Sequence, residues 1–321
     1  MTLDERSKNT FFSVVLPVYK ESDHIVDILN QIRTEMDHAS VRFELVLVDD
    51  GSPDSTWSVL KENSNAFPMM RAVRLSRNFG KEHALCAGLE MARGDAVIVM
   101  DADGQHPPTL LPEMIRTWRN TGADIVDATK THRGKESYFD RLSAGLFYRL
   151  WNKISGFELT GASDFKLLGR PAVDAYLQME ERNVFFRGMT AWLGFTRAQV
   201  PFEVASRGSG VSNWSVLKRL RLAIDGISGF SAVPLHLVTL AGVLFFFFSV
   251  IFGIYTLVLQ LSGRSVSGFA TVILLLLFIG SLLMISLGII GIYLARVYDE
   301  IKRRPRYVVA QTIESSVGED I

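Results

Sequence analysis

The sequence predicts an α/β fold built on a mainly parallel sheet, followed by two helices that span a membrane. Three observations predict this architecture. In the first 130 residues, short apolar runs alternate with helical patterns, which is typical of βαβ units. A polar cluster follows each of the first four apolar runs. Further along the chain lie two long stretches without charged residues, separated by a single arginine.

The apolar runs have the length of buried strands, and turn-forming residues end them. We expect strands over Phe12–Val18, Phe43–Val48, Met70–Leu75, Ala96–Met100 and Ile125–Ala128. After the first strand, helical spacing places four apolar side chains on one face: Ile25, Ile28, Leu29 and Ile32. Further helices are expected after Ser55 and over Glu82–Ala92.

Four of the predicted strands end in polar residues. These residues are Glu21, the pair Asp49 and Asp50, the pair Arg77 and Lys81, and the pair Asp101 and Asp103. Because open α/β sheets bind ligands at the carboxyl ends of their strands, we expect the four clusters to form one site. Their number and chemistry favour a nucleotide site.

Asp101 and Asp103 come directly after a buried strand and are spaced i, i+2. This spacing places both carboxylates on one side of an extended chain. Two such acids repel each other and favour a nearby cation. Oxygen ligands such as Asp103 and Gln105 suit Mg²⁺ or Mn²⁺ shared with a diphosphate. The alternative is that Asp101 and Asp103 belong to a polar loop that binds no metal. His106 could be a further metal ligand, but we interpret it as a loop residue.

Other classes of protein fit the sequence poorly. No G-x-G-x-x-G follows the first strand and no G-x-x-x-x-G-K-[ST] occurs, which disfavours dinucleotide enzymes and P-loop NTPases. The net charge of +0 suggests no nucleic-acid partner. The single cysteine, Cys86, excludes an intrachain disulfide or a cysteine-rich metal site.

Two stretches without charge predict the membrane spans. The gaps from Asp225 to Arg264 and from Arg264 to Arg296 hold 38 and 31 residues, more than the roughly 20 needed to cross a bilayer. We place the spans at Leu235–Leu259 and Phe269–Ala295. A buried core helix is the alternative, but apolar runs that leave no polar face disfavour it.

Basic residues flank the spans, whereas the loop between them carries only Arg264. The positive-inside rule then places both termini and the large N-terminal region in the cytoplasm. The aromatic and basic stretch Trp214–Val233 is typical of interfacial helices. We expect a cytoplasmic catalytic domain over 1–210, interfacial helices over 211–233, two transmembrane helices over 234–298 and a basic tail over 299–321. Small residues in the spans favour a homo-oligomer.

Several motifs carry a resemblance to a known family. They are Pro17-Val18-Tyr19-Lys20-Glu21, Val48-Asp49-Asp50-Gly51-Ser52, Ser76–Glu82, Asp101-Ala102-Asp103-Gly104-Gln105, Gly161–Leu167 and Phe186-Arg187-Gly188. Together with the two spans they resemble membrane-associated family 2 glycosyltransferases of GT-A fold, a Rossmann-like architecture. The resemblance is closest to bacterial polyprenyl-phosphate glycosyltransferases of the GtrB type, and dolichyl-phosphate mannose synthases are more distant relatives. It covers nearly the whole chain in order.

The resemblance implies a role for each matching residue. The nucleotide sugar would be bound by Pro17, Tyr19, Glu21, Asp50, Lys81, Asp101 and Asp103. Phosphate and acceptor groups would be bound by Arg77, Arg187, Arg207 and Ser212. The alternatives are that Asp50 or Ser52 caps the following helix and that Arg77 and Lys81 belong to a solvated helix start.

The resemblance places a catalytic base at Asp164. A lipid phosphate, with a second pKa near 6, needs little deprotonation at neutral pH. Asp164 could instead orient the acceptor or stabilise positive charge on the sugar. Its alternative is a salt bridge to Lys166 or a neighbouring arginine. The sequence departs from the family pattern at Lys20, where Asn is commoner, and at Asn213, which is often Lys.

The resemblance implies an inverting, metal-dependent enzyme that transfers a hexose from a nucleotide sugar to polyprenyl phosphate. UDP-glucose is the expected donor; UDP-galactose, GDP-mannose and UDP-N-acetylhexosamine are alternatives. A processive polysaccharide synthase is disfavoured because no Gln-x-x-Arg-Trp segment occurs. A non-catalytic membrane adaptor is disfavoured by the three carboxylates Asp101, Asp103 and Asp164.

Overall fold

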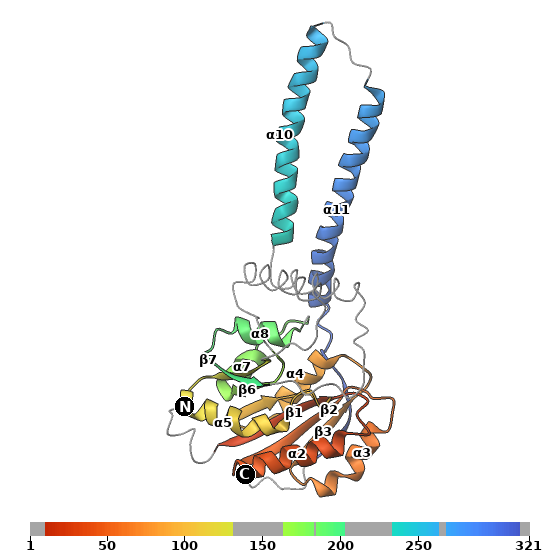
Figure 1. The fold of residues 1–321 in the computed structure, drawn as a ribbon. Helices are drawn as coiled ribbons and strands as arrows, with labels where there is room; N and C mark the ends of the chain where they lie inside the picture. The colour runs from red at the N-terminus through yellow and green to blue at the C-terminus, as the bar shows by residue number, and fades with distance from the viewer. Residues whose placement is uncertain (1–9, 131–162, 183, 203–232, 263–267, 315–321) are drawn as a thin grey trace. The chain divides into compact units, whose positions relative to one another are not determined.

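A computed structural model of the chain describes residues 10–130, 163–182, 184–202, 233–262 and 268–314 (Figure 1). These residues fall into an α/β unit, which includes the last described strand, and a second unit that contains two long helices. Each unit is described by itself.

The α/β unit is built on a mixed sheet of eight described strands in the order β7-β5-β6-β4-β1-β2-β3-β8. The four central strands are parallel: β3 (Met70–Leu75), β2 (Arg42–Asp49), β1 (Phe11–Val18) and β4 (Ala96–Val99). The outer strands are β6 (Lys166–Gly169), β5 (Ile125–Lys130), β7 (Arg197–Phe202) and β8 (Val309–Ile313). Strand β6 runs antiparallel to β4 and β5, and β8 runs antiparallel to β3. This arrangement confirms the predicted Rossmann-like α/β fold.

Helices cover both faces of the sheet. The apolar core on one face includes side chains of α2 (Ile25–His38), α3 (Thr56–Glu62) and α5 (Leu111–Thr121). The other face packs against α4 (Lys81–Met91), with α7 (Arg170–Leu177) beside it. Short helices complete the unit: η1 (Ser64–Ala66), η2 (Pro108–Leu110) and α8 (Phe186–Trp192).

Strand β1 shows why both faces need cover. Its buried side chains alternate, so Phe12 packs edge to face on Trp118 of α5 at a ring distance of 5.9 Å, whereas Val15 faces α4. A Cβ at Gly88 of α4 would lie 2.3 Å from Val15 Cγ1. Glycine at this position therefore lets α4 lie close to the sheet.

The predicted strands are confirmed, and Met70–Leu75 has the predicted ends. Strands β6, β7 and β8 were not predicted. In β8, Val309 and the next three residues are exposed, so it shows no alternation of buried and exposed positions. Its backbone pairing with β3 forms the strand instead, and backbone pairing leaves little trace in a sequence.

The second unit contains α10 (Val233–Leu261) and α11 (Phe269–Ile301). Both are long and apolar enough to cross a membrane, over Leu235–Leu259 and Leu275–Ile301, each with a mean hydropathy of 2.6. The first range matches the prediction, and the second extends beyond the predicted end at Ala295. Helix α11 continues past the first charged residues because Arg and Glu are themselves good helix formers. The predicted interfacial stretch, except for Val233, lies outside the described residues.

Candidate active site

A cleft of about 450 Å³ lies where β1, β2 and β4 end. Its lining comes from the end of β1 and from the segments that follow the four parallel strands: Pro17, Val18, Tyr19, Glu21, Asp50, Asn78, Gly80, Lys81, Asp101, Ala102 and Asp103. All seven residues predicted to bind the nucleotide sugar are in this lining. The sheet therefore brings the predicted polar clusters together at one edge.

Hydrogen bonds hold the first two segments against each other. The amide of Lys20 donates to Ser52 Oγ at 3.0 Å, and the amide of Glu21 donates to Thr56 Oγ1 at 3.1 Å. Gly51 has a φ of 65°, and a Cβ there would lie 2.5 Å from the backbone carbon of Arg77. The turn after β2 thus needs glycine both for its conformation and for its approach to the third segment.

Asp50 stabilises the loop that leads into α4. Its two carboxylate oxygens accept hydrogen bonds from the amides of Phe79 and Gly80 at 2.7 and 2.9 Å. Burial raises the pKa of Asp50, although these two bonds act in the opposite direction. The predicted alternative was a cap on the helix after β2, but Asp50 holds the start of α4 instead.

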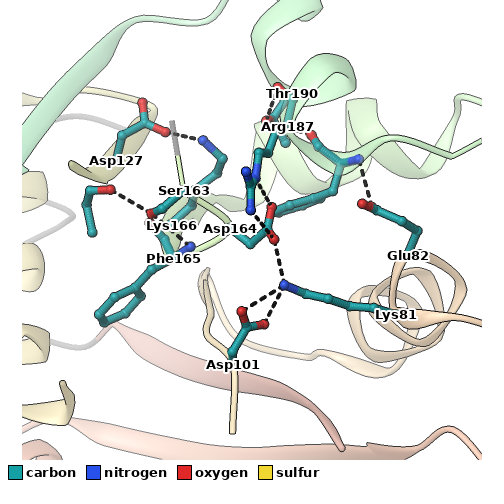
Figure 2. A network of polar contacts seen from close by, with 12 residues as sticks. Lys81, Glu82, Asp101, Asp127, Ser163, Asp164, Phe165, Lys166, Arg187 and Thr190 are labelled. Carbon is teal, nitrogen blue, oxygen red and sulfur yellow. Dashed lines mark hydrogen bonds and ion pairs between the residues drawn. The ribbon is translucent and has the colours of Figure 1, made fainter. Parts of the chain in front are cut away.

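Four charged side chains form a chain of ion pairs between two parts of the site (Figure 2). Lys81 Nζ lies 2.6 Å from Asp101 Oδ1 and 2.5 Å from Asp164 Oδ2. Arg187 Nε and one terminal nitrogen donate to the two oxygens of Asp164 at 2.6 and 2.9 Å. Lys81 therefore links Asp101, in the cleft lining, to Asp164, and Asp164 in turn binds Arg187.

The ion pairs control the charge of Asp164. Burial alone would raise its pKa, but Arg187 and Lys81 outweigh burial and lower the pKa well below its ordinary value. Burial would likewise lower the pKa of Lys81, and Asp164 and Asp101 together raise it. Asp164 is therefore a stable anion between two cations, and in this arrangement it is a very weak base.

The residues on either side of Asp164 in the sequence are held by contacts with β5 and with the loop after β4. Ser163 Oγ donates to the carbonyl of Ala128 at 2.6 Å, and the Phe165 ring stacks on His106 at 5.0 Å. Lys166 binds Asp127 and not Asp164. Of the two salt-bridge partners predicted as the alternative, Lys166 is thus wrong, whereas an arginine, Arg187, does bind Asp164, together with Lys81.

The predicted metal ligands lie together on the loop after β4. The amide of Gln105 donates to Asp103 Oδ1 at 3.0 Å, and its side-chain nitrogen donates to Asp103 Oδ2 at 2.7 Å. His106 is buried, and its Nδ1 accepts a hydrogen bond from the Asp101 amide at 2.9 Å. These bonds support the interpretation of His106 as a loop residue.

The described residues contain no group of three or more His, Cys, Asp or Glu side chains that could hold a metal by themselves. A cation shared with a diphosphate needs only one or two protein carboxylates. The cleft lining has four carboxylates, Glu21, Asp50, Asp101 and Asp103, against the one cation Lys81. Burial, and next the charge of Asp103, raise the pKa of Glu21. The excess of negative oxygen ligands therefore fits a hard divalent cation.

The residues predicted to bind phosphate do not all lie at the site. Arg187 reaches Asp164, whereas Arg77 is exposed, donates to the carbonyl of Asn78 and lies 4.2 Å from the centre of the Phe79 ring. Arg77 is not part of the cleft lining. Arg207 and Ser212 lie outside the described residues.

Sequence reasoning assigned no role to Glu82, although it follows Lys81 directly. Its Oε2 accepts a hydrogen bond from the amide of Phe186 at 2.8 Å. The sequence feature that could have pointed to a role for Glu82 is its position in the first turn of a predicted helix, next to the predicted site residue Lys81. The partner segment, 104 residues further along the chain, could not be inferred from that position.

Comparisons with known proteins agree with this geometry. The family model described as "Glycosyl transferase family 2" matches residues 13–177. The "SfII prophage-derived bactoprenol glucosyl transferase" of Shigella flexneri is 34% identical over 302 residues, covering 94% of this chain and 97% of that protein. The "Putative glycosyltransferase CsbB" of Bacillus subtilis (strain 168) is 37% identical, with 95% of this chain and 92% of that protein covered.

A solved structure supports the fold. The mannosyl-3-phosphoglycerate synthase from Rubrobacter xylanophilus superposes with a TM-score of 0.50 at 20% identity, over 70% of this chain and 74% of that chain. The fold and the acidic cleft at the strand ends define a GT-A glycosyltransferase. The chain belongs to glycosyl transferase family 2, and the relatives that match it along nearly the whole length include proteins named bactoprenol glucosyl transferase.

Proposed function

We propose that this enzyme transfers glucose from UDP-glucose to a polyprenyl phosphate at the cytoplasmic face of a membrane, with inversion at the sugar. The observation that carries the proposal is the chain of ion pairs from Asp101 through Lys81 and Asp164 to Arg187. It sets cations beside a cleft of nucleotide size, on a chain with two helices apolar enough to cross a membrane. The names of relatives that cover most of the chain favour glucose and bactoprenol.

The donor occupies the cleft at the strand ends in this proposal. Tyr19, Pro17 and Glu21 are in its lining, and strand-end carboxylates can accept hydrogen bonds from the base and the ribose. Lys81 brings positive charge to the diphosphate. It keeps its charge at neutral pH because Asp164 and Asp101 raise its pKa against the effect of burial.

A divalent cation, Mg²⁺ or Mn²⁺, would be held by Asp103, with Gln105 as a second oxygen ligand, and would stabilise the departing diphosphate. The excess of carboxylates over cations in the cleft lining supports this assignment.

The acceptor phosphate lies beside Arg187 in this proposal, because an arginine binds phosphate as a two-pronged donor. Oxygen of the lipid phosphate attacks the anomeric carbon, the bond from this carbon to the UDP oxygen breaks, and UDP leaves. One displacement gives a β-linked lipid-phosphate sugar from an α-linked donor. The lowered pKa of Asp164 favours a role in positioning Lys81 and Arg187 rather than in removing a proton.

The membrane assignment places α10 and α11 across the bilayer and both termini in the cytoplasm. The basic residues that flank the two helices support this topology. The lipid acceptor then reaches the site from the bilayer. A topology assay with reporters fused to the C-terminus or inserted in the 260–268 loop tests this part separately.

The enzymatic proposal is tested with purified protein, polyprenyl phosphate and a panel of donors, with and without EDTA. We expect one sugar per lipid, turnover with UDP-glucose above the other donors, and loss of turnover with EDTA that added Mg²⁺ or Mn²⁺ restores. Turnover only with another donor would refute the choice of sugar. Metal-independent turnover, or no transfer from any donor, would refute the mechanism or the function.

A further inference from the structure

Helices α4 and α8 both bind Asp164 through ion pairs, and a second contact joins the two helices directly. Two consecutive residues at the start of α4 make the two links. Lys81 binds Asp164 directly, and Glu82 accepts a hydrogen bond from the amide of Phe186 at 2.8 Å. Arg187, the next residue, donates two hydrogen bonds to Asp164. The contacts close a ring that joins α4, α8 and the segment before β6 (Figure 2).

We propose that Glu82 is a positioning residue, which fixes the first turn of α8 so that Arg187 can bind the acceptor phosphate. The Phe186 amide is one of the first amides of α8, which have no partner within the helix. A carboxylate is the strongest acceptor that a side chain can offer such an amide. The buried Phe186 ring also packs on Tyr176 at 5.5 Å. The amide bond and this ring contact fix the helix start from two sides.

The charges around Glu82 make this contact sensitive to pH. Burial, and next the negative charge of Asp164, raise the pKa of Glu82 to about 7, against the effects of the Phe186 amide, Lys81 and Arg187. Among the described residues, Tyr176 of α7 and Cys86 of α4 are further titratable groups that interact with it. Protonation below this pKa weakens the acceptor, so the first turn of α8 is less firmly held in mild acid.

Hydrogen exchange measured by mass spectrometry on the full-length protein tests the structural half of this inference without any substrate. We expect Glu82→Ala to increase exchange in a peptide covering 186–193 by about tenfold, because a hydrogen bond to a charged group is lost. Glu82→Gln retains an acceptor and should show a smaller increase. The control is Glu62→Gln, at an exposed glutamate of α3. Unchanged exchange in Glu82→Ala would overturn the inference.

The expected effect of Glu82 on acceptor binding rests on the proposed function. We expect Glu82→Ala to raise KM for polyprenyl phosphate about tenfold, with KM for UDP-glucose and the affinity for UDP unchanged. The pH profile separates this role from a merely structural one. Wild-type KM for the acceptor should rise as the pH falls through 7, whereas in Glu82→Gln the rise should be smaller, because only the titration of the lipid phosphate remains. The lipid phosphate titrates equally in both proteins, so the difference belongs to Glu82.

Equal losses for donor and acceptor, or identical pH profiles in wild type and Glu82→Gln, would overturn the positioning role. If no donor supports transfer even in the wild type, the proposed function fails. The exchange experiment still decides whether Glu82 fixes α8.

Discussion

A buried ion pair beside Asp164 offers a sharp test of how the site is held. Lys166 is fully buried, and Asp127, whose side chain is 5% exposed, is its partner. Asp127 also accepts two hydrogen bonds from Arg197, both at 2.8 Å. The two residues of the pair should therefore respond very differently to substitution.

Asp127→Ala leaves Lys166 as a buried cation without its partner. We expect this variant to lose about 3–5 kcal/mol of unfolding free energy, the usual cost of breaking a buried pair. Lys166→Met has similar volume and leaves Asp127 bound to Arg197, so we expect a change of about 1 kcal/mol or less. Urea unfolding of the full-length protein in detergent, followed by tryptophan fluorescence, measures both changes. Equal losses in the two variants would refute this reasoning.

The pH dependence gives a second check on the same pair. Burial lowers the pKa of Lys166 even with Asp127 present, and without Asp127 the pKa falls further. A lysine with a lowered folded pKa destabilises the fold while it is charged, and this penalty shrinks as the pH rises toward its unfolded value of about 10.4. Asp127→Ala should therefore recover part of its lost stability between pH 7 and 9.5. A constant difference from wild type across this range would contradict the assignment.

Three further outcomes are expected. Asp103→Asn should lower kcat/KM at limiting metal by about 10–100-fold and shift the Mn²⁺ titration to higher concentration, and an unshifted titration would exclude Asp103 as a ligand. Lys81→Met should raise KM for UDP-glucose about tenfold or more, because a charge-assisted bond to the diphosphate is lost; an unchanged KM would place Lys81 away from the donor. Tyr307 donates to Glu90 of α4, so Tyr307→Phe should lower the unfolding free energy by about 1 kcal/mol, and a full-length variant as stable as wild type would contradict this contribution.

The residues that line the cleft at the strand ends could be predicted because their positions follow from the strand topology alone. Parallel strands end at the same edge, so Glu21, Asp50 and Asp101 had to meet once the strands were recognised. Each residue lies within three positions of the end of its own strand. No long-range pairing had to be known.

The partners of Asp164 and Lys166 could not be predicted in the same way. Asp164 and Lys166 are two positions apart, which suggested a local salt bridge. In the folded chain, antiparallel pairing of β5 and β6 sets Asp127 directly opposite Lys166. Cross-strand neighbours interact strongly, but the register that creates them depends on β6, which the sequence pattern did not reveal.

The exposure of the charged side chains is consistent with the proposal that Asp164 holds cations for two phosphates and does not act as a base. Its carboxylate is 5% exposed, whereas the side chains of Lys81 and Arg187 are 37% and 39% exposed. The anion is thus buried behind two cations that still face solvent. A phosphate that approaches either cation is attracted to it without displacing Asp164, and the buried anion raises the pKa of Lys81. Replacing Asp164 with Asn should therefore weaken donor and acceptor binding together, whereas loss of a base would lower kcat alone.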